Sequence, residues 1–299
     1  MTANLLFGAA LGYAGLVGGL YLFQDRLLYH PVKTLTTDPG EVGLPYEEVW
    51  LETEDGFRLH GWWLPQRRGA ATLLFLHGNA GNISHRVPLL QRIYQLGVSV
   101  LIVDYRGYGL SEGKPSERGT YLDAEAAWRY LVEVLEIPPE EIVVYGRSLG
   151  GSIAAYLAAT KPTGGVVIDS TFTSLPDLAA ELYPYLPTRL LTRFRYPTVR
   201  FLERIEEPLL ILHGREDALI PPHHAERLFL AADQPKELAI LPGGHNDLPF
   251  VTSSYWELLA RWLRSRGGGR SPPPPPPPAS RDRSGPQDRP ALARPDRNG

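Results

Sequence analysis

The chain has 299 residues, a formal net charge of −3 and no cysteine. The absence of cysteine excludes disulfide bonds, thiolate metal sites and a cysteine nucleophile, although it fits a reducing or an oxidising compartment. The nearly balanced charge, without a basic stripe interleaved with aromatic residues, argues against nucleic acid as a partner.

The chain begins with an apolar segment. No charged side chain precedes Asp25, and the residues from Leu5 to Phe23 are apolar, glycine or tyrosine. This length is close to the roughly 20 residues that cross a bilayer as a helix. We therefore predict a single-pass membrane anchor over residues 1–24, of undetermined orientation, a juxtamembrane linker over 25–44, and membrane lipid as a partner. The alternatives are a buried core helix and a signal peptide, whose basic start and cleavage site are missing.

Residues 45–266 have the pattern of one α/β domain. An Asp55-Gly56 turn between two strand-like segments predicts a hairpin. Short apolar runs then alternate with longer helical patterns, which predicts a mostly parallel sheet with helices on both faces. The runs are 71–78, 98–107, 141–146, 164–170, 208–214 and 236–244. Ligands bind at the carboxyl ends of such strands, so the site is expected at that edge.

The first of these runs ends in a turn with the sequence Leu-His-Gly-Asn-Ala-Gly-Asn, residues 76–82. A backbone N–H in this turn can point at a developing oxyanion. We predict the N–H of Asn79 as that donor. His77, which precedes the glycine of the turn, is expected to be a hydrogen-bonded structural residue.

The run at 141–146 continues as Gly-Arg-Ser-Leu-Gly-Gly into an alanine-rich helical segment. A G-x-S-x-G turn between a strand and a helix is typical of a nucleophile elbow, in which a strained backbone exposes the serine Oγ. An ordinary turn needs only one glycine. We therefore predict Ser148 as a nucleophile, and the N–H of Leu149 as the second oxyanion donor.

The longest interval between predicted strands runs from Ser170 to Glu207. It is too long for an ordinary connection, so we predict a core helix and a short cap over the strand ends, at about residues 175–206. The segment from Thr188 to Arg200 contains arginines, apolar residues and no acidic residue. This pattern fits a solvated face of the cap or a surface for anionic lipid headgroups.

The loops after the last two runs supply partners for a serine nucleophile. Asp217 follows the strand at 208–214, and His245 follows the last strand. The chain order serine, acid, histidine is the one expected for this architecture. We predict that His245 accepts the Oγ proton and that Asp217 holds the imidazole tautomer.

Other polar residues nearby have alternative interpretations. Glu216 and Asp247 are alternative acids, but Glu216 should diverge from its neighbour Asp217, and Asp247 is expected to cap the loop or face solvent. His223 and His224 lack the i,i+4 spacing of helical metal ligands, which predicts a surface position at a helix start. No metal site is predicted, and because no nucleotide fingerprint has the right spacing, no cofactor is expected.

The last segment, residues 267–299, has almost no large apolar residues. Such a composition cannot bury enough surface to offset the entropy of ordering, so we predict a disordered tail. The proline run at 272–278 within it is typical of polyproline II.

Motifs in order along the chain resemble those of the α/β-hydrolases: residues 76–82, 104–113, 146–151, 213–221 and 243–247. The apolar N-terminus followed by Phe-Gln-Asp-Arg-Leu-Leu-Tyr-His-Pro is similar to membrane-anchored serine hydrolases of that superfamily, a group that includes protein depalmitoylases. The resemblance implies the α/β-hydrolase fold, a Ser148, Asp217 and His245 relay, and Asn79 and Leu149 as oxyanion donors. The chain lacks the cysteine-rich, lipidated N-terminus of eukaryotic depalmitoylases.

The combined prediction is a membrane-tethered serine hydrolase that cleaves an acyl ester or thioester through an acyl-enzyme, with no obligatory protein partner. A serine peptidase or amidase is the alternative among enzymes, because residues 146–151 and 213–221 also resemble serine oligopeptidases. A catalytically silent lipid-binding protein of the same fold is the alternative from another class.

Overall fold

The computed structural model describes residues 2–66 and 71–265; the predicted tail at 267–299, with its proline run, lies outside them. The strands are β1 (His30–Pro31), β2 (Glu47–Glu52), β3 (Arg58–Leu64), β4 (Thr72–Leu76), β5 (Ala80–Gly81), β6 (Ser99–Val103), β7 (Ile142–Arg147), β8 (Gly165–Asp169), β9 (Leu209–Gly214) and β10 (Lys236–Leu241). The α-helices are α1 (Thr2–Leu22), α2 (Gln24–Leu28), α3 (Val87–Tyr94), α4 (Glu117–Arg129), α5 (Leu149–Ala158), α6 (Leu175–Leu182), α7 (Thr188–Leu191), α8 (Thr198–Leu202), α9 (His223–Ala231), α10 (Leu248–Val251) and α11 (Ser253–Arg264). Short 3-10 segments lie at Pro39–Val42, Ile83–Arg86 and Pro139–Glu141, and a π-helical turn at Tyr130–Val134 follows α4.

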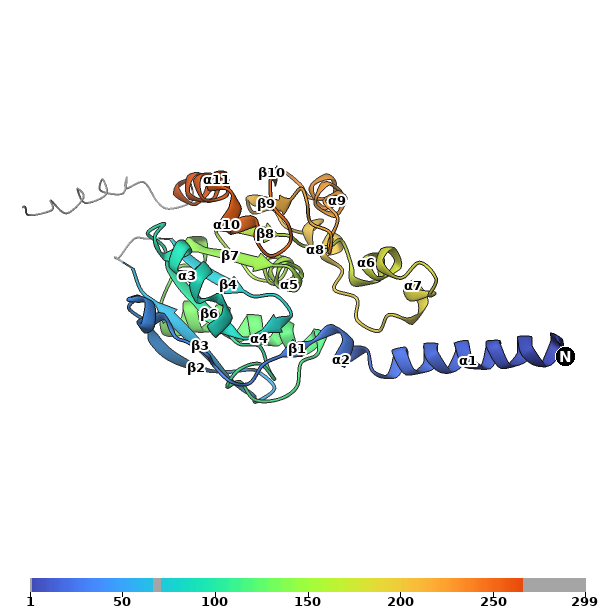
Figure 1. Ribbon diagram of the computed structural model, residues 1–299. Coiled ribbons are helices and arrows are strands. Elements are labelled where there is room, and N and C mark those ends of the chain that lie inside the picture. Colours follow the sequence, from blue (N-terminus) through green and yellow to red (C-terminus); the bar gives the residue numbers. More distant parts are fainter. Residues whose placement is uncertain (1, 67–70, 266–299) are drawn as a thin grey trace, which may run out of the picture.

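An eight-stranded sheet, in the order β10-β9-β8-β7-β4-β6-β3-β2, forms the centre of the described part of the chain (Figure 1). The six strands from β10 to β6 are parallel. The β2–β3 hairpin has the predicted Asp55-Gly56 turn between its two strands. It joins the sheet through an antiparallel pairing of β3 with β6. The predicted mostly parallel sheet is therefore confirmed.

Alternating side chains of the strands fill two cores, one on each face of the sheet. In β4, Leu74 and Leu76 belong to the core under α4, α5, α8 and α9, whereas Leu73 and Phe75 belong to the core under α3 and α11. All four side chains are fully buried. Burial of both faces explains why these strands are unbroken apolar runs in the sequence.

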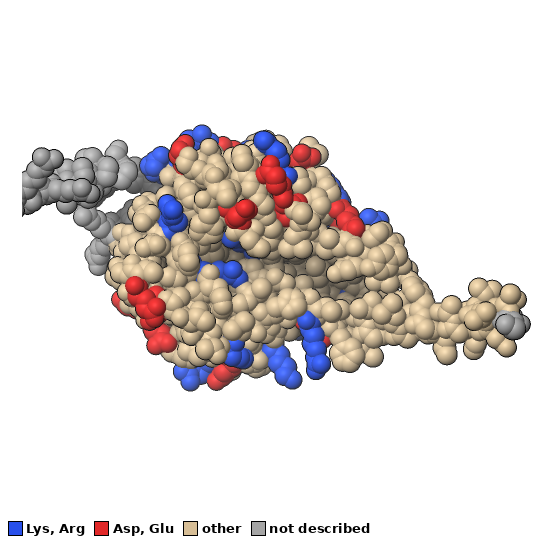
Figure 2. Space-filling view, viewed as in Figure 1, with Lys and Arg blue, Asp and Glu red and all other residues tan. Residues whose placement is uncertain are grey.

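The apolar N-terminal segment forms the 21-residue helix α1, which projects from the body as a single rod (Figure 1). Asn4–Leu22 has a mean hydropathy of 1.7, and none of it is buried inside the protein. Figure 2 shows no charged side chain on this rod in the view drawn. A core helix would be covered by the body, so the exposed position contradicts that alternative.

Residues 25–44 differ from the predicted juxtamembrane linker, because they pack along the domain. The Tyr29 side chain is 3 % exposed and lies in the core with α4 and α5. Strand β1 pairs in parallel with β5, and the Asn82 side chain donates to the carbonyls of Val32 and Thr34 at 3.0 and 2.8 Å. These contacts, which the prediction of a linker did not include, hold the base of α1 on the body.

The interval after β8, where a core helix and a cap are predicted, contains the three short helices α6, α7 and α8. Helix α8 packs against α5 and α9, whereas α6 and α7 stand away from the sheet beside the base of α1 (Figure 1). The buried Tyr196 hydroxyl hydrogen-bonds to the hydroxyls of Tyr29 at 2.7 Å and Thr120 at 3.0 Å. The cap is thus pinned both to the N-terminal segment and to α4.

Candidate active site

Ser148 lies in a sharp turn between β7 and α5. Its backbone has φ 54° and ψ −121°, a region that costs a non-glycine residue strain energy and that persists only where the surroundings enforce it. The turn requires close packing of strand and helix: a Cβ on Gly150 would lie 2.0 Å from the carbonyl oxygen of Leu76. The Ser148 side chain remains partly accessible to solvent.

The three residues predicted as a relay meet at the carboxyl edge of the sheet. The Oγ of Ser148 lies 3.1 Å from Nε2 of His245, and Nδ1 of His245 lies 2.7 Å from Oδ2 of Asp217. Because a carboxylate only accepts hydrogen bonds, Nδ1 carries the proton and Nε2 keeps its lone pair toward the serine. This arrangement has the geometry of a nucleophile, a base and an orienting acid.

Asp217 is held as an anion by its surroundings. Its side chain is buried, and its Oδ1 accepts hydrogen bonds from the backbone N–H groups of Leu219 and Ile220 at 3.0 and 2.8 Å. Burial raises the pKa of this carboxyl, but the hydrogen bonds from His245 and Ile220 outweigh burial and leave the pKa below its usual value. The carboxylate is therefore charged at neutral pH and can stabilise an imidazolium.

The two alternative acids have other partners. Oε2 of Glu216 accepts from the N–H of Gly243 at 2.6 Å, and Oδ1 of Asp247 accepts from the N–H of Gly244 at 2.6 Å. Both carboxylates therefore brace the loop that carries His245. Of the three acidic residues, Asp217 is therefore the one whose carboxylate contacts the imidazole of His245.

The turn after β4 lies directly against the nucleophile. A Cβ on Gly78 would be 3.3 Å from Cβ of Ser148. Among the described residues, no backbone acceptor binds the N–H of Asn79 or of Leu149, and Leu149 is the first residue of α5. Free N–H groups at a helix start and in an adjacent turn suit a developing negative charge.

The Asn79 side chain has a structural role that the sequence did not indicate. Its Nδ2 donates to the carbonyl of Leu28 at 2.6 Å, and the backbone carbonyl of Asn79 accepts from the N–H of His30 and from the hydroxyl of Tyr108. The turn beside Ser148 is thus tied to the N-terminal segment just after α2.

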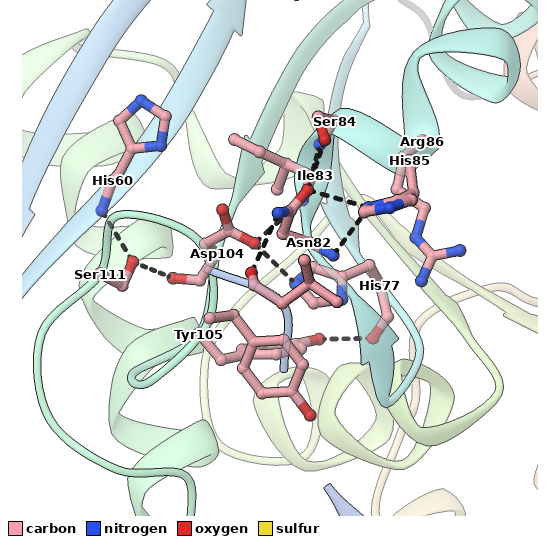
Figure 3. Close-up of polar contacts among 12 residues, drawn as sticks. His60, His77, Asn82, Ile83, Ser84, His85, Arg86, Asp104, Tyr105 and Ser111 are labelled. Atoms are coloured by element: carbon pink, nitrogen blue, oxygen red, sulfur yellow. Dashed lines mark hydrogen bonds and ion pairs between the residues drawn. The ribbon is translucent and has the colours of Figure 1, made fainter. Parts of the chain in front are cut away.

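A buried polar cluster that includes His77, Asp104 and Tyr105 supports the turn after β4 (Figure 3). The His77 ring and the Asp104 carboxyl face each other at 3.6 Å, Asp104 accepts from the N–H of Ile83 at 2.9 Å, and the hydroxyl of Tyr105 donates to the carbonyl of His77. Burial lowers the pKa of His77 to about 3 and raises that of Asp104 to about 8. Both groups are therefore mainly neutral at pH 7, as expected of the structural role predicted for His77.

Arg147 is a site residue that the motif did not reveal. Its guanidinium donates to the carbonyl of His245 and lies 3.5 Å from the carboxylate of Asp169. Asp169 also accepts from the hydroxyls of Tyr145 and Tyr255 at 2.6 and 2.9 Å. The residue beside the nucleophile therefore braces the loop of the base, a contact between distant segments that has no local sequence signal.

The prediction of a surface position for both adjacent histidines is wrong for His224. Its side chain is fully buried under the cap, whereas that of His223 is 47 % exposed. The first turn of α9 directs His224 inward toward Thr173, with its Nδ1 3.0 Å from the threonine hydroxyl. Both rings lie near Glu181 of α6.

Comparison with known sequences finds relatives over most of the chain. Residues 71–199 match the α/β-hydrolase fold family. An α/β-hydrolase domain-containing protein of Arabidopsis thaliana is 36 % identical over 74 % of this chain and 80 % of its own length. An uncharacterized membrane protein of Saccharomyces cerevisiae is 33 % identical over 84 % of this chain and 92 % of its own length. An uncharacterized Mycobacterium tuberculosis protein is 38 % identical over 80 % of this chain and 86 % of its own.

Solved structures show the same fold. An esterase from Pyrococcus furiosus superposes with a TM-score of 0.67 at 23 % identity, covering 81 % of this chain and 99 % of the esterase. An α/β hydrolase from Vibrio vulnificus superposes with a TM-score of 0.63 at 26 % identity, covering 74 % of this chain and 82 % of that protein. The predicted fold class is therefore confirmed.

Proposed function

The chain belongs to the α/β-hydrolase family, and on that premise we propose that it is a serine hydrolase that cleaves acyl esters or thioesters through an acyl-enzyme on Ser148. The observation that carries this proposal is the continuous contact from Ser148 Oγ to His245 Nε2 and from His245 Nδ1 to Asp217, at 3.1 and 2.7 Å. The strained backbone of Ser148 is further support, because strain of this kind is typical of a nucleophile elbow.

In the first half of the reaction, His245 Nε2 takes the Oγ proton while Ser148 attacks the acyl carbonyl. The N–H groups of Asn79 and Leu149 bind the oxyanion, and the imidazolium, stabilised by Asp217, returns the proton to the departing alcohol or thiol. In the second half, His245 deprotonates a water molecule, which attacks the acyl-enzyme; the imidazolium then returns the proton to Ser148 Oγ as the bond to the acyl group breaks and the carboxylic acid is released. These steps need no cofactor.

We place the enzyme at a membrane, with α1 as a single-pass anchor. The support is the length and the hydropathy of Asn4–Leu22, none of which is buried inside the protein, together with a relative that is named as a membrane protein. Membrane lipid is then the environment in which the cap lies.

Contacts between anchor and cap support access of amphiphilic substrates from the bilayer. The Gln24 side chain donates to the carbonyl of Leu191 and accepts from the N–H of Arg193, both at 2.8 Å. Further along α1, the Tyr13 hydroxyl donates to the carbonyl of Tyr185 at 3.1 Å. Tyr13 lies nine residues, about 14 Å of helix, before Leu22 at the end of α1, and Gln24 is the first residue of α2. If Gln24 lies at the membrane surface, the cap therefore reaches well into one leaflet.

The side chains around that contact suit this environment. Tyr185 is 70 % exposed and Leu190 is 84 % exposed. The guanidinium of Arg193 lies over the Tyr21 ring, near the base of α1, where it can meet a lipid headgroup. We therefore favour a long-chain or otherwise amphiphilic acyl group over a small water-soluble ester.

The test is hydrolysis by full-length protein, in detergent and in vesicles, of acyl esters and thioesters of graded chain length. We expect turnover that increases with chain length and is lost in Ser148→Ala, whereas Ser254→Ala, at an exposed serine, retains it. Turnover of peptide amides alone would favour a peptidase. Lipid binding without turnover of any substrate would favour a silent binding protein and contradict the proposal.

A further inference from the structure

Two arginines lie beside Ser148 on different loops. Arg147 directly precedes the nucleophile, at the end of β7, and its guanidinium donates to the backbone carbonyl of His245. Arg86 directly precedes α3, and its guanidinium donates to the backbone carbonyl of Ala80, just after the turn that contacts Ser148. One guanidinium is therefore fixed to the loop of the base, and the other to the turn of the proposed oxyanion donor.

The charge of Arg86 has no counter-ion among the described residues. Its Nε is buried without a hydrogen-bond partner, and its guanidinium contacts a backbone carbonyl but no carboxylate. Asp104 belongs to the same cluster in Figure 3, but no dashed line joins it to Arg86, and its raised pKa of about 8 leaves it mainly neutral at pH 7. Since charges removed from water are normally paired, this cation needs an explanation.

Arg147 adds to the positive charge beside the nucleophile. Its Nε lies 3.5 Å from Oδ2 of Asp169, and its side chain is 11 % exposed. Burial and the Arg147 guanidinium lower the pKa of Arg86, so the two cations lie close enough to repel each other. Two guanidinium groups and one carboxylate leave an excess of positive charge here, which a bound anion would balance.

Both arginines keep N–H groups free for such an anion. Nη2 of each side chain donates to a backbone carbonyl, whereas Nη1 binds no other group in the described part of the chain and is not buried. One arginine can occupy both oxygens of a carboxylate by itself. A phosphate has further oxygens and can accept from two arginines at once. The pair therefore fits a phosphate better than a carboxylate.

The position of Arg86 indicates which end of the substrate carries the phosphate. Helix α3 packs on the face of the sheet opposite α5, and in Figure 1 it lies away from α1, α6 and α7. The proposed function brings the acyl chain from the side of α1 and the cap. The leaving alcohol or thiol, on the other side of the scissile bond, then lies toward Arg86.

We propose that Arg86 and Arg147 bind a phosphate on the leaving group, so that the preferred substrates are acyl esters or thioesters of phosphorylated alcohols or thiols. This inference rests on the proposed function and names its substrate class. Water cleaves the acyl bond at Ser148, the carboxylic acid and the phosphorylated alcohol or thiol leave, and the phosphate itself is unchanged. The two arginines determine specificity and take no part in proton transfer.

The test compares two lipids with the same acyl chain, 1-acylglycerol 3-phosphate and 1-acylglycerol, as substrates of full-length protein in neutral detergent. We expect kcat/KM to favour the phosphate-bearing lipid by about tenfold or more, and Arg86→Gln to remove most of this preference. Arg86→Lys keeps the charge and should retain part of it. A turn loosened by loss of the contact with Ala80 would slow both substrates alike and so cancel in the ratio.

Arg92→Gln is the matched control, because it removes the same charge from an exposed position on α3 and should leave the ratio unchanged. Equal use of both lipids by the wild type, a preference that Arg86→Gln leaves unchanged, or an equal loss in Arg92→Gln would each overturn the inference. Binding of both lipids to Ser148→Ala separates it from the proposed function. Tighter binding of the phosphate-bearing lipid, without turnover of either lipid by the wild type, would support the phosphate site and contradict the hydrolysis.

Discussion

The carboxyl edge of the sheet and the interface between the cap and the N-terminal helices α1 and α2 are built in different ways. At the edge, Ser148, Asp217 and His245 each lie just after a strand, and the parallel sheet brings the three loops together. Between cap and anchor, side chains of α1 and α2 bind backbone groups 167 to 172 residues away. The edge is therefore encoded by short sequence motifs, whereas the interface between cap and anchor depends on how distant segments of the chain pack.

This difference predicts that substitutions at the edge affect the chemical step strongly, whereas those between cap and anchor affect delivery of substrate weakly. The turn that carries Asn79 lies between the two, since it touches Ser148 on one side and the N-terminal segment on the other. An intermediate effect is expected there.

Among substitutions that leave Ser148 in place, the largest loss of kcat is expected at Asp217. Asp217→Asn keeps the shape of the side chain but favours the wrong tautomer of His245, and we expect kcat to fall by about 10⁴-fold. Glu216→Gln, which alters a carboxylate that binds Gly243, is the matched control and should reduce kcat far less. If Glu216→Gln is the more damaging change in steady-state kinetics, the acid is wrongly assigned.

An intermediate effect is expected at the turn. Asn79→Ala leaves the backbone N–H but removes the hydrogen bond to Leu28, so the oxyanion donor is no longer held in place. A displacement of about 1 Å can cost about 10²-fold, and we expect a loss of that order in kcat with little change in KM. An unchanged kcat would mean that the side chain does not position this turn.

A smaller effect is expected between cap and anchor. Gln24→Ala removes both hydrogen bonds to the cap, and we expect KM for a long-chain ester in vesicles to rise by a few-fold. Kinetics with a short soluble ester should not change. Gln95→Ala, at an exposed glutamine on the other side of the body, is the control. An equal change with both esters would contradict a role of this contact in delivery.

The smallest effect is a shift in stability with pH from the cluster in Figure 3. Burial raises the pKa of Asp104 to about 8, so the folded protein keeps a proton that the unfolded chain releases. Its contribution to stability is therefore lost as the pH rises toward and through 8. The amide introduced by Asp104→Asn cannot titrate, and each pH unit between the unfolded and folded pKa values of the carboxyl changes its contribution by about 1.4 kcal/mol, so the Tm of this variant relative to the wild type should rise by several °C between pH 5.5 and 8.5. A difference in Tm that does not change with pH would contradict the raised pKa.

Much of the edge could be predicted from sequence because its signals are local. Unbroken apolar runs predicted the parallel strands, and the glycines around Ser148 predicted a turn in which a Cβ has no room. The positions of Asp217 and His245 followed from the rule that parallel strands end at one edge.

The features that could not be predicted depend on packing between segments that are far apart in the chain. Residues 25–44 were predicted to be a juxtamembrane linker, yet Tyr29 enters the core, β1 pairs with β5, and the Asn82 side chain donates to two backbone carbonyls of this segment. His224 read as a surface residue, yet the cap covers it. Neither contact has a periodicity or motif from which it could be inferred.

The proposal that Ser148 is an activated nucleophile is tested most directly by covalent labelling. Full-length protein is treated with an organophosphorus probe, and the modified residue is identified by mass spectrometry. The account predicts stoichiometric label on Ser148 and none on the Ser148→Ala variant. Label that persists in this variant, or that maps to Ser111 or Ser170, would contradict it.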